Sequence, residues 1–243
     1  MKNTFVGTNI IFLECVDSTN NYTANLFKSG AIDSGTVIMT DKQTSGRGQR
    51  QNEWHSDAFS NLLFSVAADL KLWKIKNIIS LNHIVALSIH DFLSAHTENV
   101  KIKWPNDVMI EDEKSAGILI ENQYSSQQVK SIIGIGININ QQEFDLPRAT
   151  SLKIATGQSY SPRNMIYSLV DILDGYVALY QHKGSEYLHS LYNEHLWKRN
   201  VNHVFQFDNQ MKKGKIVTST IEGELLVDIN GHHHLFKNGE VKY

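Results

Sequence analysis

The stretch VKIKWPNDVMIEDEKSAGILIEN, from Val100 to Asn122, decides the fold. Two strand-like segments are separated at Pro105, and the turn sequence Glu-Asp-Glu-Lys leads into a longer apolar segment. A further strand-like segment, VKSIIGIGININ (129–140), carries β-branched residues at nearly every other position. Short turns between consecutive strands are typical of antiparallel pairing. The stretch therefore predicts an antiparallel meander.

Helical patterns and further strands lie on both sides of this meander. Apolar residues recur with helical spacing in residues 77–95, 164–183 and 186–197. Another helix is indicated after Asp17 or Ser18 as N-cap, with Gly30 as C-cap. Strand-like segments occupy residues 10–16, 34–43 and 61–69. Together these elements predict an α+β fold with a mixed, largely antiparallel sheet covered by helices.

The pattern changes after Arg199. Four short strand-like segments with glycine-bearing turns follow within the remaining residues. Short strands at this spacing favour a small barrel or sandwich. We therefore expect a main domain in residues 1–197 and a small C-terminal β-domain in residues 198–243.

Composition narrows the class of protein. The 243 residues carry a net charge of −2, which gives no indication of nucleic-acid or anionic-membrane binding. No apolar run approaches the length of a membrane span, and the N-terminus lacks signal-peptide features. The single cysteine, Cys15, excludes an internal disulfide framework and is expected to be a buried small apolar residue. A cytoplasmic enzyme or binding protein is predicted.

The segment DKQTSGRGQRQNEW (41–54) is polar and rich in glycine. Gly46 and Gly48 permit close backbone approach, and Arg47 and Arg50 present planar cations suited to phosphate or carboxylate. In isolation the segment is also consistent with an ordinary surface loop. As a binding element, it would be mobile when empty and would close over an anion.

Three further motifs carry polar groups at strand or helix ends. Asn106 and Asp107 of KWPND suit a hydrated Mg²⁺ or a phosphate, although an Asx-turn capping a hairpin gives the same pattern. Lys114 is the first residue of KSAGILIE, just before the apolar part of this strand, and is either a solvated charge or an ammonium over a buried anion. Gly134 and Gly136 of GIGININ leave space for a ligand whose ring edge Asn138 could read.

The order of these motifs resembles that of biotin protein ligases. It runs STN at a helix start, Q-x-x-GRG, KWPND, K-x-x-GIL and G-x-GIN, and covers roughly residues 11–140. The resemblance implies a class II synthetase-like catalytic domain with a C-terminal SH3-like barrel. It also implies an enzyme that joins biotin to ATP, with Mg²⁺, as biotinyl-5′-adenylate. The biotinyl group would then pass to one lysine of a carrier domain, usually of acetyl-CoA carboxylase or a related carboxylase.

The resemblance also assigns residues. Lys114 and Arg47 would be catalytic, and Asp107 would be placed near Mg²⁺. Biotin contacts would come from Ser18, Thr19, Asn20, Gln43, Arg47, Gly48, Gln49, Lys114 and Gly117. ATP and adenylate contacts would come from Arg50, Trp54, Trp104, Asn106, Asp107 and Asn138.

The glycine loop departs from the fullest family pattern, GRGRRGRxW. It reads GRGQRQNEW, so that Gln49 and Asn52 replace arginines and Gln51 replaces a glycine. The loss of two positive charges predicts weaker retention of the adenylate, or compensation by Arg50.

Alternatives remain at this level. A lipoate–protein ligase would run the same class of reaction, and a non-catalytic biotin-binding module could keep the pocket. The histidines at 232–234 suggest a metal site only weakly, because strand alternation lets at most two converge. His83, His90 and His96 are expected to be partly exposed. Longer family members carry a DNA-binding domain before the catalytic domain. Because DSTN already begins at residue 17, we expect no room for such a domain here. Both a monomer and a homodimer are consistent with the sequence.

Overall fold

The computed structural model describes residues 4–50, 52–124 and 129–243, so that Gln51 lies outside the described residues. Seven strands form one sheet in the order β1-β2-β3-β7-β6-β5-β4. Their bounds are β1 Asn9–Leu13, β2 Thr36–Thr40, β3 Leu62–Asp69, β4 Val100–Lys103, β5 Asp107–Ile110, β6 Glu113–Tyr124 and β7 Val129–Ile137. Only β1 and β2 pair in parallel among these strands as described, so the predicted largely antiparallel sheet is confirmed.

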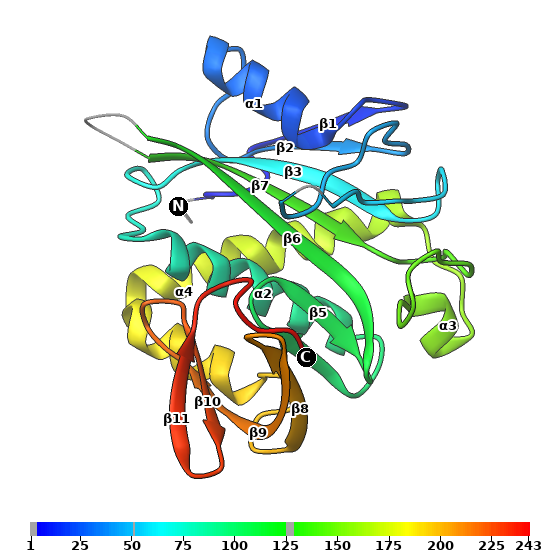
Figure 1. Cartoon of the computed structure of the whole chain (residues 1–243). Helices are drawn as coiled ribbons and strands as arrows, with labels where there is room; N and C mark the ends of the chain where they lie inside the picture. Colours follow the sequence, from blue (N-terminus) through cyan, green and yellow to red (C-terminus); the bar gives the residue numbers. More distant parts are fainter. Residues whose placement is uncertain (1–3, 51, 125–128) are drawn as a thin grey trace.

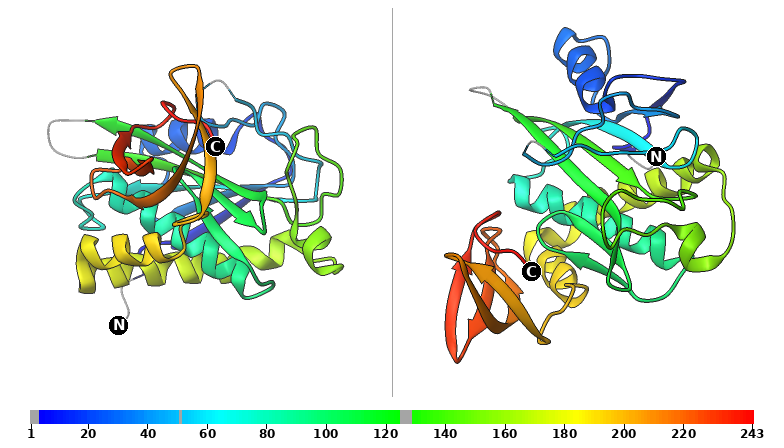
Figure 2. Two further views of the ribbon diagram at one scale, coloured as in Figure 1. Left: turned by 60° about the horizontal axis from the view of Figure 1, so that its bottom comes forward. Right: turned by 45° about the vertical axis from the view of Figure 1, so that its right-hand side comes forward.

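Helices cover both faces of this sheet. Helix α1 (Thr19–Ser29) lies on one face, whereas α2 (Ile78–Ser94) and α4 (Pro162–Glu194) pack together against the other (Figures 1 and 2). The main hydrophobic core lies between the sheet and α2 and α4. A much smaller apolar cluster, with Phe27 and Ile132, lies beneath α1. The α1 face is therefore the face with room for polar side chains and a ligand.

The helix ends follow the sequence signals. Ser18 is the N-cap of α1, and Gly30 ends this helix at φ 75°, with its N–H directed at the carbonyls of Leu26 and Phe27. Asn77 caps α2 by accepting a hydrogen bond from the Ser80 N–H. The two helices expected between residues 164 and 197 form α4, which is interrupted at Gly184 by a φ of 80°. A short helix, α3 (Leu152–Thr156), was not predicted.

The C-terminal residues form a second, smaller sheet with the strand order β11-β10-β9-β8. Its strands are β8 Asn202–Phe207, β9 Gln210–Ser219, β10 Leu225–Ile229 and β11 His232–Phe236. No pairing between β8 and β11 closes this sheet within the described residues. The predicted four-stranded antiparallel unit is therefore confirmed, but as an open sheet rather than the expected SH3-like barrel. The division of the chain into two domains at residue 198 stays a prediction.

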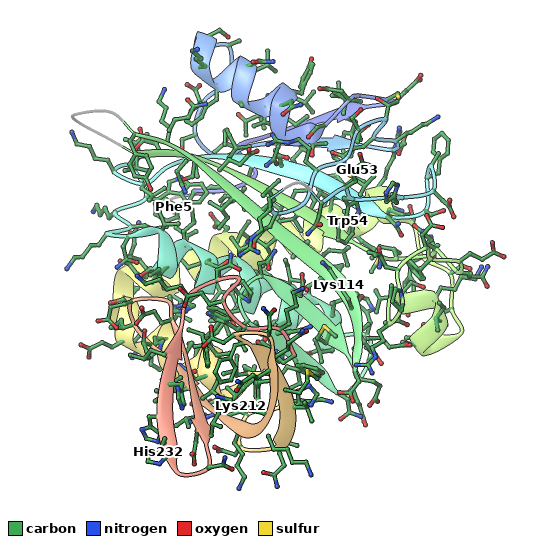
Figure 3. All side chains as sticks on the ribbon, in the orientation of Figure 1. Phe5, Glu53, Trp54, Lys114, Lys212 and His232 are labelled. Atoms are coloured by element: carbon green, nitrogen blue, oxygen red, sulfur yellow. The ribbon has the colours of Figure 1, made fainter. Side chains whose placement is uncertain are left out.

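Two sequence expectations about burial are wrong. Cys15 is exposed rather than buried, because β1 ends at Leu13 and leaves it outside the sheet. His83 and His90 are buried, since α4 packs on the face of α2 that carries them. The histidines at 232–234 lie on β11 at the far end of the small sheet (Figure 3), and the described residues contain no group of three potential metal ligands. No helix in the described part of the chain is long and apolar enough to span a membrane.

Candidate active site

Glycines from two paired strands form the floor of the candidate site. Gly117 of β6 lies opposite Gly136 of β7, and Gly134 lies opposite Leu119. The indole of Trp54 occupies the space above the first pair, so a Cβ at Gly136 would lie 2.5 Å from its Cε2 atom. The amide of Asn20 fills the corresponding space above Gly134. The missing side chains thus allow α1 and the glycine loop to approach the sheet backbone.

A hydrogen-bond network fixes the N-terminus of α1 over this floor. The Oε1 atom of Gln43 accepts hydrogen bonds from the N–H (2.8 Å) and the hydroxyl (3.1 Å) of Thr19. The buried hydroxyl of Ser65 lies 2.8 Å from Thr19 Oγ1 and 2.6 Å from Asn20 Oδ1. Because Oε1 is engaged, the amide nitrogen of Gln43, which has no partner among the described residues, remains a donor for a ligand.

A charge pair stands at the other end of the site. The Lys114 ammonium forms an ion pair with Asp107, with 2.7 Å between Nζ and Oδ1. Oδ1 is buried, so this ion pair is partly shielded from water. Lys114 Nζ also lies 5.5 Å from the centroid of the Trp54 ring, and Figure 3 shows the two side chains beside β6. A cation that is half-buried here is suited to stabilise an anion bound under Trp54.

The glycine loop folds as a small hairpin over the site. The N–H of Gly48 bonds to the Asn52 carbonyl (2.8 Å), and the N–H of Trp54 bonds to the Gly46 carbonyl (2.9 Å). Arg47 reaches across to β6, where its guanidinium makes a bidentate contact with Glu121 at 2.8 and 3.1 Å. Glu121 also accepts a hydrogen bond from Asn20 (2.8 Å). This carboxylate therefore joins the loop, α1 and the sheet at one point.

The C-terminal segment holds the same loop from the opposite side. The Nδ2 atom of Asn238 donates to Gln49 Oε1 (2.9 Å), and Arg50 donates to the Asn238 carbonyl (2.9 Å). The Arg50 guanidinium packs against Gly239, where a Cβ would overlap it. Arg50 is therefore engaged with the C-terminal segment, so the expected compensation for the missing loop arginines would require it to reorient.

The residues of the KWPND motif face two different parts of the molecule. Asn106 caps the turn, because its side chain donates to the Ile118 carbonyl (2.9 Å) and its own carbonyl accepts from the Ile118 N–H (2.9 Å). Lys103 and Trp104 face the C-terminal unit instead. The Trp104 indole donates to the Gly223 carbonyl (3.1 Å). Burial lowers the pKa of the Lys103 ammonium, and the nearby Asp107 carboxylate partly opposes this lowering.

These groups line one cavity of about 480 Å³. It brings together every residue that the sequence predicted except Trp104, which lies behind the KWPND turn. The predicted residues that line it are Ser18, Thr19, Asn20, Gln43, Arg47, Gly48, Gln49, Arg50, Trp54, Asn106, Asp107, Lys114, Gly117 and Asn138. Asn138 is buried, and its amide donates to the Thr150 carbonyl (3.0 Å).

Several residues of the site were not predicted. Ser65 was signalled only as a lone hydroxyl in an apolar strand, and Glu121 only as the carboxylate that ends KSAGILIE. Phe144 and Leu146 line the cavity from the segment after β7. Asn238 carried no local signal, because its place in the wall depends on how the C-terminal unit packs.

Comparison with known proteins shows the family of the chain. Residues 12–138 match the biotin/lipoate A/B protein ligase family. A bifunctional ligase/repressor of Bacillus subtilis is 30% identical over 239 residues, covering 95% of this chain and 72% of that protein. Its counterpart from Bacillus spizizenii is 33% identical over 178 residues, covering 70% of this chain and 54% of that protein. The chain thus spans about half to three quarters of the length of these two relatives.

A solved structure resembles the whole chain. The biotin protein ligase of Aquifex aeolicus in complex with biotin and ATP is 26% identical, with a TM-score of 0.79. The alignment covers 97% of this chain and 98% of that one. The similarity therefore includes the C-terminal unit as well as the large sheet.

Proposed function

Because the chain belongs to the biotin/lipoate A/B protein ligase family, we propose that it is a biotin protein ligase. It would join biotin to ATP as biotinyl-5′-adenylate and then transfer the biotinyl group to one lysine of a biotin carboxyl carrier domain. The acceptor would belong to acetyl-CoA carboxylase or a related carboxylase. The observation that carries the proposal is one cavity with a glycine floor under Trp54 and the Lys114–Asp107 charge pair at its end.

The first step needs no nucleophile from the protein. The biotin carboxylate attacks the α-phosphorus of ATP, an oxygen–phosphorus bond forms, and pyrophosphate leaves with the electron pair of the bond that breaks. The protein must hold two anions against each other and stabilise the charge that moves. We assign this role to Lys114, with Arg47 from the loop, because these two cations approach the cavity from the sheet and from the loop. Arg47 would exchange Glu121 for the phosphate as ligand binds.

The donor set fits a magnesium ion that arrives with ATP. Mg²⁺ is usually held by one or two carboxylates together with substrate phosphates and water. Asp107 offers a buried carboxylate oxygen, Oδ1, whose ion-pair partner in the described structure is the Lys114 ammonium. When bound, the ion would neutralise charge on the phosphates. Asp107 would be its ligand from this chain, and Lys114 would then be released toward the substrate.

The loop composition bears on how firmly the adenylate is held. Gln49 stands where the fullest family pattern has arginine, and its amide is bonded to Asn238 rather than to a cation or an anion. A neutral amide gives less attraction to phosphate than a guanidinium does. We therefore propose that this chain retains the adenylate less firmly than a ligase with the fully basic loop. Cytoplasmic location and the lack of DNA binding stay predictions.

The test is biotin-dependent ATP–pyrophosphate exchange, with lipoate in place of biotin as the comparison. We expect exchange with biotin, and a fall of about 10²–10³-fold in Lys114→Ala. Lys71→Ala, at an exposed position outside the cavity, is the matched control. Exchange with lipoate but not with biotin would favour lipoate–protein ligase. Binding of biotin without exchange would favour a non-catalytic module.

A further inference from the structure

A second cavity, of about 240 Å³, lies beside the first. It is bounded by the start of α2, the KWPND turn, β6 and the C-terminal unit. Figure 1 shows α2 and the C-terminal unit on the same side of the large sheet. Ile79, Ile120 and Pro105 contribute apolar walls. Its volume corresponds to about eight water molecules, which is more than the side chain of one lysine occupies.

The lining of this cavity carries no formal charge. None of its lining residues in the described structure is Asp, Glu, Lys or Arg. Burial, followed by the nearby His189, lowers the pKa of His83 to about 3, so this imidazole is neutral at pH 7. Such a lining disfavours a phosphate, a carboxylate or an ammonium, since nothing there compensates for their lost hydration. A nucleotide is therefore a poor fit for this cavity.

One hydroxyl at the cavity has no partner. Tyr192 is 1% exposed, lines the cavity and packs against His83, with 4.4 Å between the ring centroids and the ring planes tilted by 39°. Its Oη atom is buried without a hydrogen-bond partner in the described part of the chain. Buried hydroxyls in native proteins are nearly always paired. The free hydroxyl is therefore available to a neutral group that enters the cavity and can donate or accept a hydrogen bond.

The two cavities share three lining residues. Gln49, Ile118 and Asn238 line both of them. The hydrogen bond that the Asn238 side chain donates to Gln49, at 2.9 Å, thus stands between the second cavity and the candidate active site. Because Gln49 belongs to the glycine loop, movement of the loop would break this bond and join the cavities.

We propose that the second cavity admits the acceptor lysine of the carrier protein, an inference that rests on the proposed function. Of the substrates, only this lysine has an apolar stem and a tip that must lose its charge before it reacts. Burial among uncharged groups favours the neutral amine. The amine then attacks the acyl carbon, a carbon–nitrogen bond forms, AMP leaves with the electrons of the acyl–oxygen bond, and one proton passes to solvent. Tyr192 serves as a positioning residue that meets the amine on its way.

Blocking the cavity tests the proposal. Ile79→Trp fills it from α2 and Ile120→Phe fills it from β6, and both wild-type side chains are half-buried. Leu72→Trp, at an exposed position outside both cavities, is the matched control. The first half-reaction is followed by pyrophosphate exchange. The second is followed by transfer from preformed biotinyl-5′-AMP to a carrier domain, with hydroxylamine as a small substitute nucleophile.

In both filling variants we expect transfer to the carrier to fall at least about tenfold, while exchange and discharge by hydroxylamine stay within about twofold of wild type. The proposed route for the acceptor lysine is refuted if pyrophosphate exchange falls together with transfer. It is also refuted if transfer to the carrier is undiminished in either folded variant. A wild-type protein without biotin-dependent exchange would instead refute the proposed function.

Tyr192→Phe provides a second test that leaves the cavity open. We expect the KM for the carrier to rise several-fold, with the kcat of exchange unchanged. Tyr176→Phe is the control, because the Tyr176 hydroxyl is bonded to Asp91 away from both cavities. An unchanged KM for the carrier in Tyr192→Phe would show that the Tyr192 hydroxyl does not contact the acceptor lysine.

Discussion

Substitution of Gly136 by alanine tests whether the glycine floor exists to seat Trp54. The added Cβ would lie 2.5 Å from Trp54 Cε2 and 2.9 Å from Nε1. Carbon atoms that are not bonded approach to about 3.5–4.0 Å, so the indole must move by about 1 Å or more. The floor cannot yield, because Gly136 is paired on both sides, with Leu63 of β3 and Gly117 of β6.

The strain therefore acts on the loop rather than on the fold. Overpacking of this kind costs about 1–3 kcal/mol, which corresponds to about 5–150-fold in an equilibrium between closed and open loop. We expect the Kd for biotin and the KM for ATP to rise within this range. The melting temperature should change little, since the indole can leave the floor without exposing the main core.

Calorimetric titration with biotin and thermal melting measure the two effects separately. Gly175→Ala is the matched control, because no heavy atom lies within 4 Å of the position of its Cβ. In a double-mutant cycle, Gly136→Ala should add little once Trp54 is alanine. Wild-type affinity in Gly136→Ala, or full additivity with Trp54→Ala, would show that Trp54 does not rest on this floor when ligand binds.

Three further predictions concern the C-terminal segment, its anchor and a buried histidine. Asn238→Ala removes the hydrogen bond that its side chain donates to Gln49 but keeps the backbone carbonyl that accepts from Arg50, so trypsin should cleave after Arg50 several-fold faster than in wild type, and an unchanged rate would contradict the role of the Gln49 contact. Asn193→Leu leaves the buried Ser219 N–H without its acceptor, and we expect about 1–3 kcal/mol lower stability in denaturant unfolding. The folded pKa of His83, about 3, lies below its ordinary value of 6.5, so the unfolded chain binds more protons between these values and stability falls as pH decreases through this window. At pH 5 the loss from this group reaches about 2 kcal/mol, and His83→Phe should lack that part of the pH dependence in unfolding measured from pH 7 to pH 5.

The sequence predicted the parts of the site that depend on short motifs. Gly134 and Gly136 were expected to leave space, and the structure places Asn20 and Trp54 in that space. This worked because side-chain alternation along a strand depends on local geometry alone. Lys114 and Asp107 could likewise be expected near each other, since only a tight turn separates their strands.

Contacts between distant parts of the chain could not be predicted in this way. His83 was expected to be partly exposed as a polar residue on a helix, but Tyr192 and His189 of α4 pack on that side of α2. Asn238 reaches the glycine loop across 189 positions of sequence. Nothing in either local pattern encodes such a pairing, because it depends on where the C-terminal unit packs.

Trp104 shows how the C-terminal unit bears on the active site. Its motif predicted a contact with the nucleotide, yet its indole bonds to Gly223 and its carbonyl accepts a hydrogen bond from the hydroxyl of Tyr243 at 2.8 Å. The next residues of the same turn, Asn106 and Asp107, line the active-site cavity. A displacement of the C-terminal unit would therefore shift the turn that carries Asp107. The same displacement would release the glycine loop at Asn238, so both ends of the cavity depend on one packing interface.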